Sequence, residues 1–562
     1  MQDNLANGTM SHTDWNSIDW NQANRVVRNL RQRIFKATQA GDYIKVRQLQ
    51  KLMLRNYSNT LVSVRRVTQV NAGKYTHGVD KVIVKTPEAR SILVDEIQQF
   101  QPWKTQPARR VYIPKSNGKQ RPLGIPTVLD RVHQARVKNA LEPEWEAKFE
   151  GISYGFRPGR GCHDAIMAIY GFSRPNKKKK WVVDADIKGA FDNIDHEFLL
   201  NAIGNFPARQ LIKKWLKSGY VDKNVFHDTE AGTPQGGIIS PLLANIALHG
   251  MEDALKIKRA NSSGVVVGTR GVVRYADDFV VFCETKEDAE KSICELHTWL
   301  AERGLALSEE KTKIVHLSEG FDFLGFNVRL YNRPSTPTGY KLLIKPSKKS
   351  VQSFKDRLKT EWMSLRGANA TAVIHRLNPI VRGWANYYRI GNSVDAFKHL
   401  DMFMFLRAVR WAKRQHPGRS WKYITQKYWR QWNKQRKDNW VFGDEETKFH
   451  LCKFTWVNIK RHVMVKGKAS MDDPSLNGYW LKREAKKASS LAKHLRIIAA
   501  SQGYICPVCK QSISNGEEIH DHHLIMDRNN PDRNLWKNRR ILHLYCHQQV
   551  HSSKNRNNEL LY

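Results

Sequence analysis

The sequence predicts a multidomain α/β protein in which a helical extension, a long mixed α/β region, a helical region and a small Cys/His module follow one another. The length of 562 residues allows three or four domains. The apolar fraction of 41% is large enough for true hydrophobic cores. Short apolar runs of strand character alternate with helical periodicity in the middle of the chain, and three of the seven cysteines gather near its end.

The charge balance predicts a polyanionic partner. Lys and Arg number 93 against 53 Asp and Glu, a formal net charge of +40. Aromatic residues are interleaved with basic ones in Trp421-Lys422-Tyr423 and around Tyr428-Trp429, which favours nucleic acid, RNA above all, over a lipid surface. A core with a basic exterior would explain many of these aromatic residues one by one, but not the net charge.

Neither a membrane span nor a disulfide framework is expected. The chain has no stretch of about 20 apolar residues, and Met1 to Ser17 lacks the layout of a signal peptide. Four cysteines are scattered singly, whereas the other three lie beside histidines near the end. This distribution indicates a reducing compartment and one local metal site.

Helical periodicity marks both flanks of the mixed region. Residues 1–60 are predicted as an N-terminal helical extension, and residues 61–345 as the mixed α/β region. The apolar residues of the two expected N-terminal helices are Val26, Leu30 and Ile34, then Val46, Leu49, Leu52 and Leu54. After Lys345-Pro346, Ser347 is a plausible helix cap, and residues 346–440 are predicted as a helical domain. Residues 441–500 are predicted as a basic DNA-binding region and linker, and residues 501–562 as the Cys/His module.

The most informative segment is Tyr275-Ala276-Asp277-Asp278. Apolar residues of strand character flank it on both sides, so we expect two strands joined by a tight turn that carries the acids. Burying carboxylates is costly unless a cation or a donor compensates them. A solvated Asp-Asp turn is the alternative for this segment taken alone.

A second acidic strand supports the metal interpretation. Residues 181–187 form an apolar strand in which Asp184 and Asp186 share one face. If this strand lies beside the hairpin, Asp186 joins Asp277 and Asp278. Three carboxylates can hold two Mg²⁺ ions about 3.5–4 Å apart, which is the arrangement used in nucleotidyl transfer.

Several ordered segments make the chain resemble group II intron-encoded reverse transcriptases and maturases with a C-terminal HNH endonuclease domain. Besides the Tyr275 segment, the matching ones are Arg110–Lys115, Arg121–Pro126, Tyr154–Arg160, Asp186–Asp192, Gly232–Gly237, Glu310–Lys313 and Phe323–Phe326. The resemblance implies a right-hand polymerase with fingers, a palm with an antiparallel sheet and an α-helical thumb, followed by a zinc-stabilised ββα-metal HNH module.

The resemblance also implies roles for individual residues of the polymerase. Asp186, Asp277 and Asp278 would be the catalytic Mg²⁺ ligands. The remaining residues would bind substrate: Lys115 and Arg121 the triphosphate, Phe191 as a steric gate that selects dNTPs, Gln235 and Gly236 in the nucleotide pocket, Lys311 near the substrate, and Leu324 and Gly325 at the primer end. Phe191 as a core aromatic, and Lys115 and Arg121 as contacts to the RNA backbone, remain alternatives.

Residues 378–388 resemble the maturase thumb, called domain X. Trp384, Tyr387 and Tyr388 at helical spacing are most simply packing residues. In this family, basic surfaces of the thumb and the N-terminal helices bind the intron RNA, and such binding weakens steeply with salt.

The terminal module carries two ligand pairs. Cys506 with Cys509, and His543 with Cys546, form a plausible Cys₃His structural Zn²⁺ site. The resemblance implies His523 as the general base, Asn538 as the residue that orients it, and His522 and His547 as ligands of the nuclease metal. Asp521-His522 as the metal and base pair, and Asn534 in place of Asn538, stay open. Asn529-Asn530 and Arg539 depart from the usual pattern, so a module that binds DNA without cutting it is also an alternative.

The implied function combines target-primed reverse transcription, splicing assistance and target-DNA nicking in intron mobility, or retrohoming. The partners would be group II intron RNA in a ribonucleoprotein, target DNA and dNTPs. The location would be the bacterial cytoplasm with nucleoid association, or an organelle. A maturase without polymerase activity is disfavoured because the aspartates and the Pro-Gln-Gly turn are intact. A diversity-generating or defence-associated enzyme is disfavoured by the thumb and the HNH resemblance.

Overall fold

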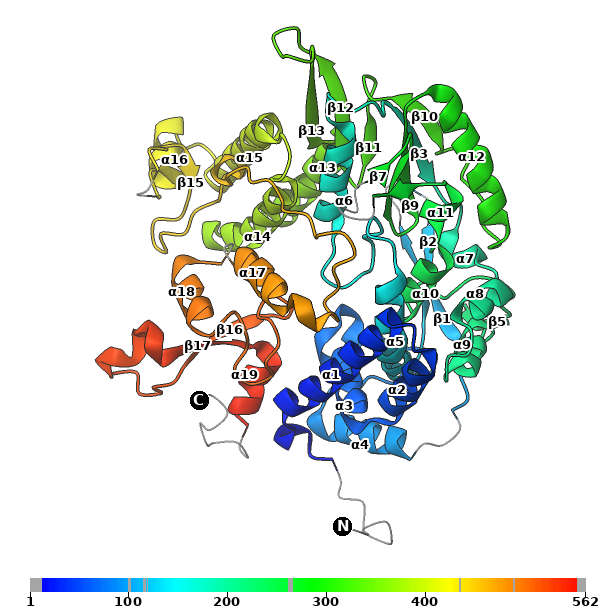
Figure 1. Cartoon of the computed structure of the whole chain (residues 1–562). Coiled ribbons are helices and arrows are strands. Elements are labelled where there is room, and N and C mark those ends of the chain that lie inside the picture. The colour runs from blue at the N-terminus through cyan, green and yellow to red at the C-terminus, as the bar shows by residue number, and fades with distance from the viewer. Residues whose placement is uncertain are drawn as a thin grey trace.

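The computed structural model describes residues 13–99, 103–114, 118, 120–260, 266–433, 436–488 and 491–552. In Figure 1 the N-terminal helices lie at the bottom, the strands of the central region at the right, the later helices at the upper left, and the C-terminal module at the lower left. The C-terminal module therefore lies beside the N-terminal helices, although almost the whole chain separates them in sequence.

The N-terminal helices pack around one long central helix. The five helices of this region are α1 (Trp20–Gln39), α2 (Tyr43–Arg55), α3 (Tyr57–Arg65), α4 (Pro87–Gln98) and α5 (Val128–Lys148). Helices α1, α2 and α3 all contact α5. The expected apolar face of α2 is wrong at Leu52, which is 48% exposed, because Met53 points into the core instead. The expected boundary at residue 60 falls inside α3.

The names fingers, palm and thumb are used below for the regions that the resemblance predicts as such. The fingers region contains a four-stranded sheet in the order β2-β1-β4-β5. Its strands are β1 (Ala108–Pro114), β2 (Gln120–Ile125), β4 (Tyr220–Asp222) and β5 (Val225–His227). Strands β1 and β2 form an antiparallel hairpin, and β4 joins β1 in parallel. Strand β2 lies at the edge of this sheet, where the backbone N–H of Gly124 donates to the carbonyl of Gln235.

The palm contains the second four-stranded sheet, in the antiparallel order β10-β3-β9-β8. Its strands are β3 (Trp181–Asp186), β8 (Gly271–Tyr275), β9 (Asp278–Cys283) and β10 (Lys313–His316). Val280, Val281 and Phe282 of β9 are fully buried. Long helices pack on the sheet: α12 (Lys286–Ala301) on β3, β9 and β10, and α6 (Cys162–Ser173) on β8. The remaining short elements of the palm are α7 (Ala190–Asn193), α8 (His196–Ile203), α9 (Arg209–Leu216), α10 (Ser240–Ala247), α11 (Met251–Ala254), β6 (Lys258–Arg259) and β7 (Val266–Val267).

A three-stranded sheet connects the palm to the thumb helices. Its strands are β11 (Phe321–Phe323), β12 (Phe326–Asn332) and β13 (Tyr340–Pro346). The helices of the thumb are α13 (Lys348–Ser364), α14 (Ala370–Tyr388), α15 (Val394–Gln415) and α16 (Trp421–Tyr428). Ser347 caps α13 as expected, because its side chain accepts a hydrogen bond from the backbone N–H of Ser350.

The aromatic residues of the thumb are divided between core and surface. Trp384 stacks on Phe354 with ring centroids 4.8 Å apart, and Tyr388 is buried, so packing explains both. The expectation of base-stacking aromatics is wrong for Tyr428 and Trp429, which are buried in the hydrophobic core. Trp421 remains exposed.

The segment after the thumb makes extended contacts with other parts of the chain. Strands β14 (Trp429–Arg430) and β15 (Val441–Phe442) pair across the expected boundary at residue 440. Farther along, the Asp401 carboxylate accepts hydrogen bonds from the backbone N–H groups of Phe454 and Thr455. Asp164 accepts from the backbone of Val465 in the same way, and Arg31 of α1 forms an ion pair with Asp472. The part predicted as a linker thus bridges the thumb, palm and N-terminal helices.

The C-terminal module shares a hydrophobic core with the N-terminal helices. Its elements are α17 (Asn477–Ala488), α18 (Lys493–Ser501), β16 (Ile519–His523), β17 (Arg539–His543) and α19 (Leu544–Val550). Trp20, Leu61 and Val64 belong to the same buried cluster as Val508 and Ile541. The side chain of Asn24 donates a hydrogen bond to the carbonyl of Cys509, which fixes the two parts together.

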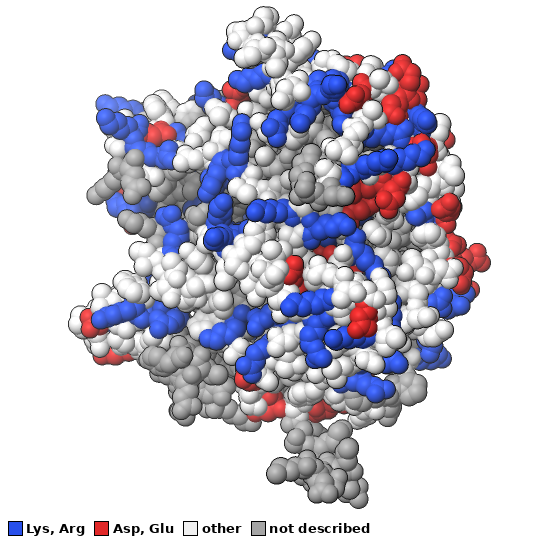
Figure 2. All heavy atoms as spheres, viewed as in Figure 1, with Lys and Arg blue, Asp and Glu red and all other residues white. Residues whose placement is uncertain are grey.

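Basic side chains cover much of the molecule. In Figure 2, Lys and Arg run across the middle of the visible face, whereas Asp and Glu gather toward the upper right, where α12 lies in Figure 1. Among the described residues, no helix is long and apolar enough to cross a membrane.

Candidate active site and metal centres

The acidic hairpin has the expected form. Strands β8 and β9 pair with Tyr275 opposite Asp278, and Ala276 takes a positive φ of 59° in the two-residue turn. Gly155 packs against this turn so closely that a Cβ there would lie 2.3 Å from the backbone nitrogen of Ala276. Only glycine is compatible with this packing, which holds the hairpin tip against the palm.

Arg274 supports the turn from inside the protein. It is fully buried, and its Nη1 donates hydrogen bonds to the carbonyl of Ala276 and to Oδ1 of Asn245, both at 3.1 Å. Burial lowers the pKa of Arg274 to about 10. Arg274 is a positioning residue that was not predicted from the sequence, although it is a single charge in the apolar strand Gly271–Tyr275.

The strand pairing brings the three aspartates together. Asp186 at the end of β3 lies opposite Asp278 in the register of β3 and β9, and Asp277 precedes Asp278 in the turn. Burial, together with the charges of Asp277 and Asp186, raises the pKa of Asp278 to about 7. Burial is also the largest cause that raises the pKa of Asp277. The carboxylates thus repel one another, which is the electrostatic condition that bound cations relieve.

Lys311 supplies a cation to this cluster. Its Nζ forms an ion pair with Oδ2 of Asp186, and this hydrogen bond is the largest cause that raises the pKa of Lys311. Within the described residues, the groups of three or more ligand atoms that all lie within 4.8 Å of one another are in the C-terminal module. The palm aspartates are therefore an open set, with Lys311 beside one of them.

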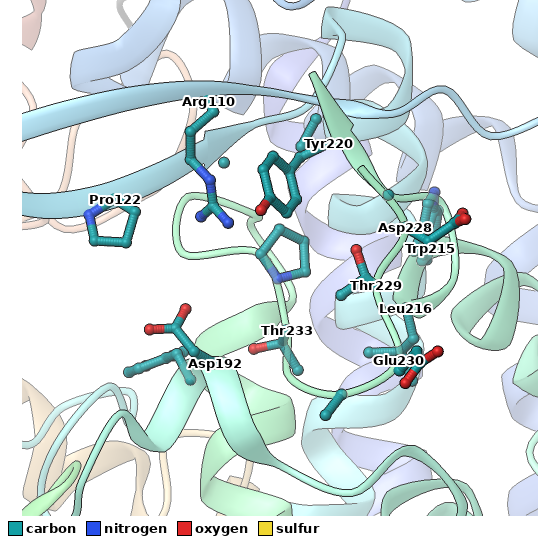
Figure 3. Close-up of a pocket in the computed structure, with 16 residues that line it drawn as sticks. Arg110, Pro122, Asp192, Trp215, Leu216, Tyr220, Asp228, Thr229, Glu230 and Thr233 are labelled. Carbon is teal, nitrogen blue, oxygen red and sulfur yellow. The ribbon is translucent and has the colours of Figure 1, made fainter. Parts of the chain in front are cut away.

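A cavity of about 260 Å³ is lined by Phe191 and by Pro122 and Pro234, the chain neighbours of Arg121 and Gln235, but not by Arg121, Gln235 or Gly236 themselves. In Figure 3, Arg110 and Pro122 of the fingers lie on one side of it, and Asp192 and Thr233 lie on the other. Phe191, which is partly buried, also lines this cavity. Both a gate and a packing role remain compatible with this position.

The Pro-Gln-Gly-Gly turn connects the palm to the fingers strand β2. Gln235 donates through Nε2 to Oδ2 of Asp192 at 3.0 Å, and its carbonyl accepts from the backbone N–H of Gly124. A Cβ at Gly236 would lie 2.6 Å from the carbonyl oxygen of Gly124, and its φ is 145°. The turn therefore requires glycine at this point.

Arg121 and Lys115 are the two basic residues expected to contact the triphosphate. Arg121 lies on β2 opposite Ile113, and its charge acts to lower the pKa of Asp277 against the larger effect of burial. Arg121 is thus within electrostatic reach of the aspartates. Lys115 lies outside the described residues.

The Leu324-Gly325 turn between β11 and β12 is held by the thumb. Both residues have positive φ, and a Cβ at Gly325 would lie 2.6 Å from the hydroxyl oxygen of Tyr388. The hydroxyl of Tyr387 donates to the carbonyl of Leu324 at 2.9 Å. Tyr387, expected only as a packing residue, therefore connects thumb helix α14 to this turn.

The four zinc ligands predicted in the terminal module come together. Cys506, Cys509, His543 and Cys546 are all buried, and their ligand atoms lie within 4.8 Å of one another. Three thiols and one imidazole match the donor preference of Zn²⁺ in a closed structural site. Arg65 of α3 donates to Sγ of Cys546 at 3.0 Å. This contact was not predicted, because no local sequence pattern indicates it.

A second group of ligands contains one histidine more than predicted. His522, His547 and His551 have ring nitrogens within 4.8 Å of one another. Burial, with the charges of His547 and His551, lowers the pKa of His522 to about 4, so its imidazole is neutral and able to bind a metal. His551 follows His547 by four residues, a helical spacing that could have identified it from the sequence.

Asn534 and Asn538, the two candidates for orienting His523, have different hydrogen-bond partners. Nε2 of His523 lies 3.2 Å from Oδ1 of Asn534, whereas the side chain of Asn538 donates to the carbonyl of Asp532. The neighbour of His523 is therefore Asn534, the alternative left open above. Asp521 forms an ion pair with Arg539, which agrees less well with a metal and base pair at Asp521-His522.

Three family models match consecutive parts of the chain. Residues 15–97 match the N-terminal domain of reverse transcriptase, residues 113–328 match reverse transcriptase (RNA-dependent DNA polymerase), and residues 351–429 match the group II intron, maturase-specific domain. The third match coincides with the expected thumb. These three segments end before the Cys/His module.

Curated relatives include proteins from bacteria and fission yeast. Protein YkfC of Escherichia coli is 36% identical over 327 residues, which are 51% of this chain and 85% of that protein. The group II intron-encoded protein LtrA of Lactococcus lactis is 30% identical over 395 residues, 56% of this chain and 65% of LtrA. An uncharacterized 91 kDa protein in the cob intron of Schizosaccharomyces pombe is 29% identical over 443 residues, 65% of this chain and 53% of that protein. The chain thus spans less than two thirds of the length of these two intron proteins.

Proposed function

Since the chain belongs to the family of group II intron reverse transcriptases and maturases, we propose that it is an RNA-directed DNA polymerase that extends a DNA primer with dNTPs on an RNA template. The observation that carries this proposal is the register of β3 and β9, which sets Asp186 opposite Asp278 beside the turn residue Asp277. The intact Pro-Gln-Gly-Gly turn and its contact with Gly124 support it.

Asp186, Asp277 and Asp278 are the residues that would hold Mg²⁺. Their oxygen donors and raised pKa values at Asp277 and Asp278 suit a hard divalent cation. When bound, such ions would neutralise phosphate charge and activate the primer hydroxyl. Arg274 keeps the turn in place, and Lys311 balances Asp186 before substrate arrives.

The proposed substrate contacts come from Phe191, which lines the cavity of Figure 3, and from residues of the fingers, the Pro-Gln-Gly-Gly turn and the Leu324-Gly325 turn. Phe191 would exclude a ribose 2′-hydroxyl and so favour dNTPs, while Gln235 and Gly236 would line the nucleotide site. Arg121 suits the triphosphate because its guanidinium donates charge-assisted hydrogen bonds, and Lys115 is proposed for the same role from the sequence. Leu324 and Gly325 would contact the primer end, held there by Tyr387.

The same protein would bind intron RNA and assist its splicing. The maturase-specific match over residues 351–429 and the net charge of +40 support this part of the proposal. Basic surfaces of the thumb and the N-terminal helices would contact RNA phosphates in a ribonucleoprotein.

The terminal module would be a DNA-nicking nuclease that supplies the primer for target-primed reverse transcription in intron mobility. His523 would act as the general base, oriented by the amide oxygen of Asn534, with Asn538 closing the turn. His522, His547 and His551 would hold a divalent ion, which would stabilise phosphate charge at the cut bond. Cys506, Cys509, His543 and Cys546 would hold a structural Zn²⁺.

Primer extension on an RNA template tests the polymerase. Asp277→Ala should abolish DNA synthesis while leaving the melting temperature and RNA binding near those of the wild type. Equal synthesis by both proteins would refute the polymerase assignment. For the nuclease, His523→Ala should abolish nicking of target DNA without affecting synthesis, and undiminished nicking would refute the base assignment.

A further inference from the structure

A second cavity, of about 530 Å³, lies where the N-terminal helices meet helix α19. It is separate from the polymerase cavity of Figure 3, since the two share no lining residue. Its volume is within the range of sites that hold small ligands. The side chains that matter most are Arg65, Lys74, Tyr75, Lys85, Arg90 and Tyr545.

The lining is cationic and contains no carboxylate. Within the part of the chain that the structure describes, Lys74, Lys85 and Arg90 form no ion pair. Arg90 is only 7% exposed, yet its guanidinium donates to neutral oxygens: Nε to Oγ1 of Thr68 and Nη2 to the carbonyl of Lys85. Burying a cation without a counter-ion is unfavourable, so this arrangement suits an anionic ligand.

Aromatic rings stand beside these cations. The side chain of Tyr75 is 62% exposed, whereas that of its neighbour Lys74 contacts Tyr545 of the C-terminal module. Nζ of Lys74 donates to the hydroxyl of Tyr545 at 2.6 Å and lies 5.1 Å from the centre of that ring. Cations next to an exposed ring are the combination that binds single-stranded nucleic acid, because phosphates contact the cations and a base stacks on the ring.

Helix α19 connects this cavity to the histidine cluster. Leu544, Tyr545 and Gln549 line the cavity, whereas His547 of the same helix and His551, its C-cap residue, lie against His522. A strand that occupies the cavity would therefore lie one helix away from the histidines.

We propose that this cavity is a nucleotide subsite for single-stranded DNA beside the nuclease centre, with Lys74, Lys85 and Arg90 at a phosphate and Tyr75 under a base. The identity of the strand as DNA rests on the proposed nuclease function, whereas the preference for a nucleotide rests on the cavity itself. Neither the family matches nor the polymerase site assigns a role to these residues.

Photocrosslinking tests the proposal directly on the full-length protein. A short single-stranded DNA containing 5-iododeoxyuridine should crosslink to Tyr75, as read by mass spectrometry of the peptides. Lys74→Gln with Lys85→Gln should remove most of this crosslink and lower the slope of log affinity against log salt by about 0.7 for each lost phosphate contact. The double variant Lys74→Arg with Lys85→Arg should keep both the Tyr75 crosslink and the salt slope of the wild type.

The matched control is Lys45→Gln with Lys51→Gln, two exposed lysines of α2 that do not line the cavity and carry the same charge change. This control should leave the Tyr75 crosslink unchanged. An equal loss in the control, or no crosslink at Tyr75 in the wild type, would overturn the proposal. A stronger crosslink with RNA of the same sequence would overturn the assignment to DNA.

The outcomes also separate this proposal from the nuclease proposal. His523→Ala should keep the Tyr75 crosslink while losing nicking. A crosslink in a wild-type protein that nicks no DNA would support the cavity and refute the nuclease, whereas normal nicking without a crosslink would refute the cavity alone.

Discussion

The palm and the C-terminal module both gather ligands for divalent metals, but they do so in opposite ways. In the palm, Asp186, Asp277 and Asp278 lie at the end of a large sheet whose strands are buried without any metal. In the module, the buried residues Cys506, Cys509, His543 and Cys546 have ligand atoms within 4.8 Å of one another, and the three cysteines lie in the same buried cluster as Val508 and Ile541. The hydrophobic core stabilises the palm, and its three aspartates form an open set of ligands. The module is built around its ligands.

This difference predicts separate tasks for the metals proposed at the two places. A closed set of Cys and His contributes folding free energy, whereas an open carboxylate set leaves room for substrate. Removing a ligand should therefore unfold the module locally, and removing an aspartate should leave the palm folded. The following changes test that contrast.

The largest effect is expected from Cys546→Ser. Because Zn²⁺ binding in small modules contributes about 10–16 kcal/mol of apparent free energy, losing one ligand should release the metal and unfold residues 501–552. Zinc content should fall by one equivalent and trypsin should cleave within the module, while DNA synthesis stays near the wild-type rate. Cys294→Ser, at an exposed cysteine of α12, is the matched control. Retention of the zinc and of protease resistance would contradict the structural role of this set.

The next effect distinguishes the two asparagines near His523. Asn534→Ala should lower the nicking rate by about 10–100-fold, the usual cost of losing a group that orients a site residue. Asn538→Ala should have a smaller effect, since its side chain contacts only the carbonyl of Asp532. Zinc content and DNA synthesis should be unchanged in both proteins. The opposite ranking would return the orienting role to Asn538.

A stability effect is expected at Asp278. Its pKa in the folded protein is about 7 and its ordinary value is 3.8, so between these values the folded state holds a proton that the unfolded chain has released. The free energy of unfolding therefore falls as the pH rises through this interval and levels off above it. Asp278→Asn removes the fall, and its melting temperature without metal should exceed that of the wild type by a few degrees above pH 7 and match it near pH 4. Melting curves across this range, with and without Mg²⁺, measure the difference. A difference independent of pH would contradict the repulsion among the aspartates.

The smallest effect concerns the connection between thumb and primer turn. Tyr387→Phe removes the hydrogen bond to the carbonyl of Leu324, a loss of about 0.5–1.5 kcal/mol or roughly 2–10-fold. We expect a higher KM for the primer–template and shorter products, with an unchanged rate of single-nucleotide addition. Tyr340→Phe, on the exposed strand β13, should change neither. An effect on the addition rate alone would instead place Tyr387 in the chemistry.

The sequence predicted those parts of the sites that depend on local pattern. Acids at the ends of apolar strands predicted the hairpin and the position of Asp186. The paired Cys and His residues predicted the ligand set Cys506, Cys509, His543 and Cys546. Arg274 and Arg65 were missed because their partners are chosen by packing. Arg65 and Cys546 lie 481 positions apart in sequence, and no periodicity connects them. Leu52 was placed inside because the pattern alone does not distinguish it from Met53.

The core shared by the N-terminal helices and the terminal module has a consequence for synthesis of the protein. Leu61 and Val64 leave the ribosome more than 400 residues before their partners Val508 and Ile541. At about 5–20 residues per second, this interval lasts on the order of 20–90 s. During that time an apolar face that is buried in the finished protein is open to chaperones or to another chain. The C-terminal module completes this buried cluster only after the rest of the chain has been synthesised.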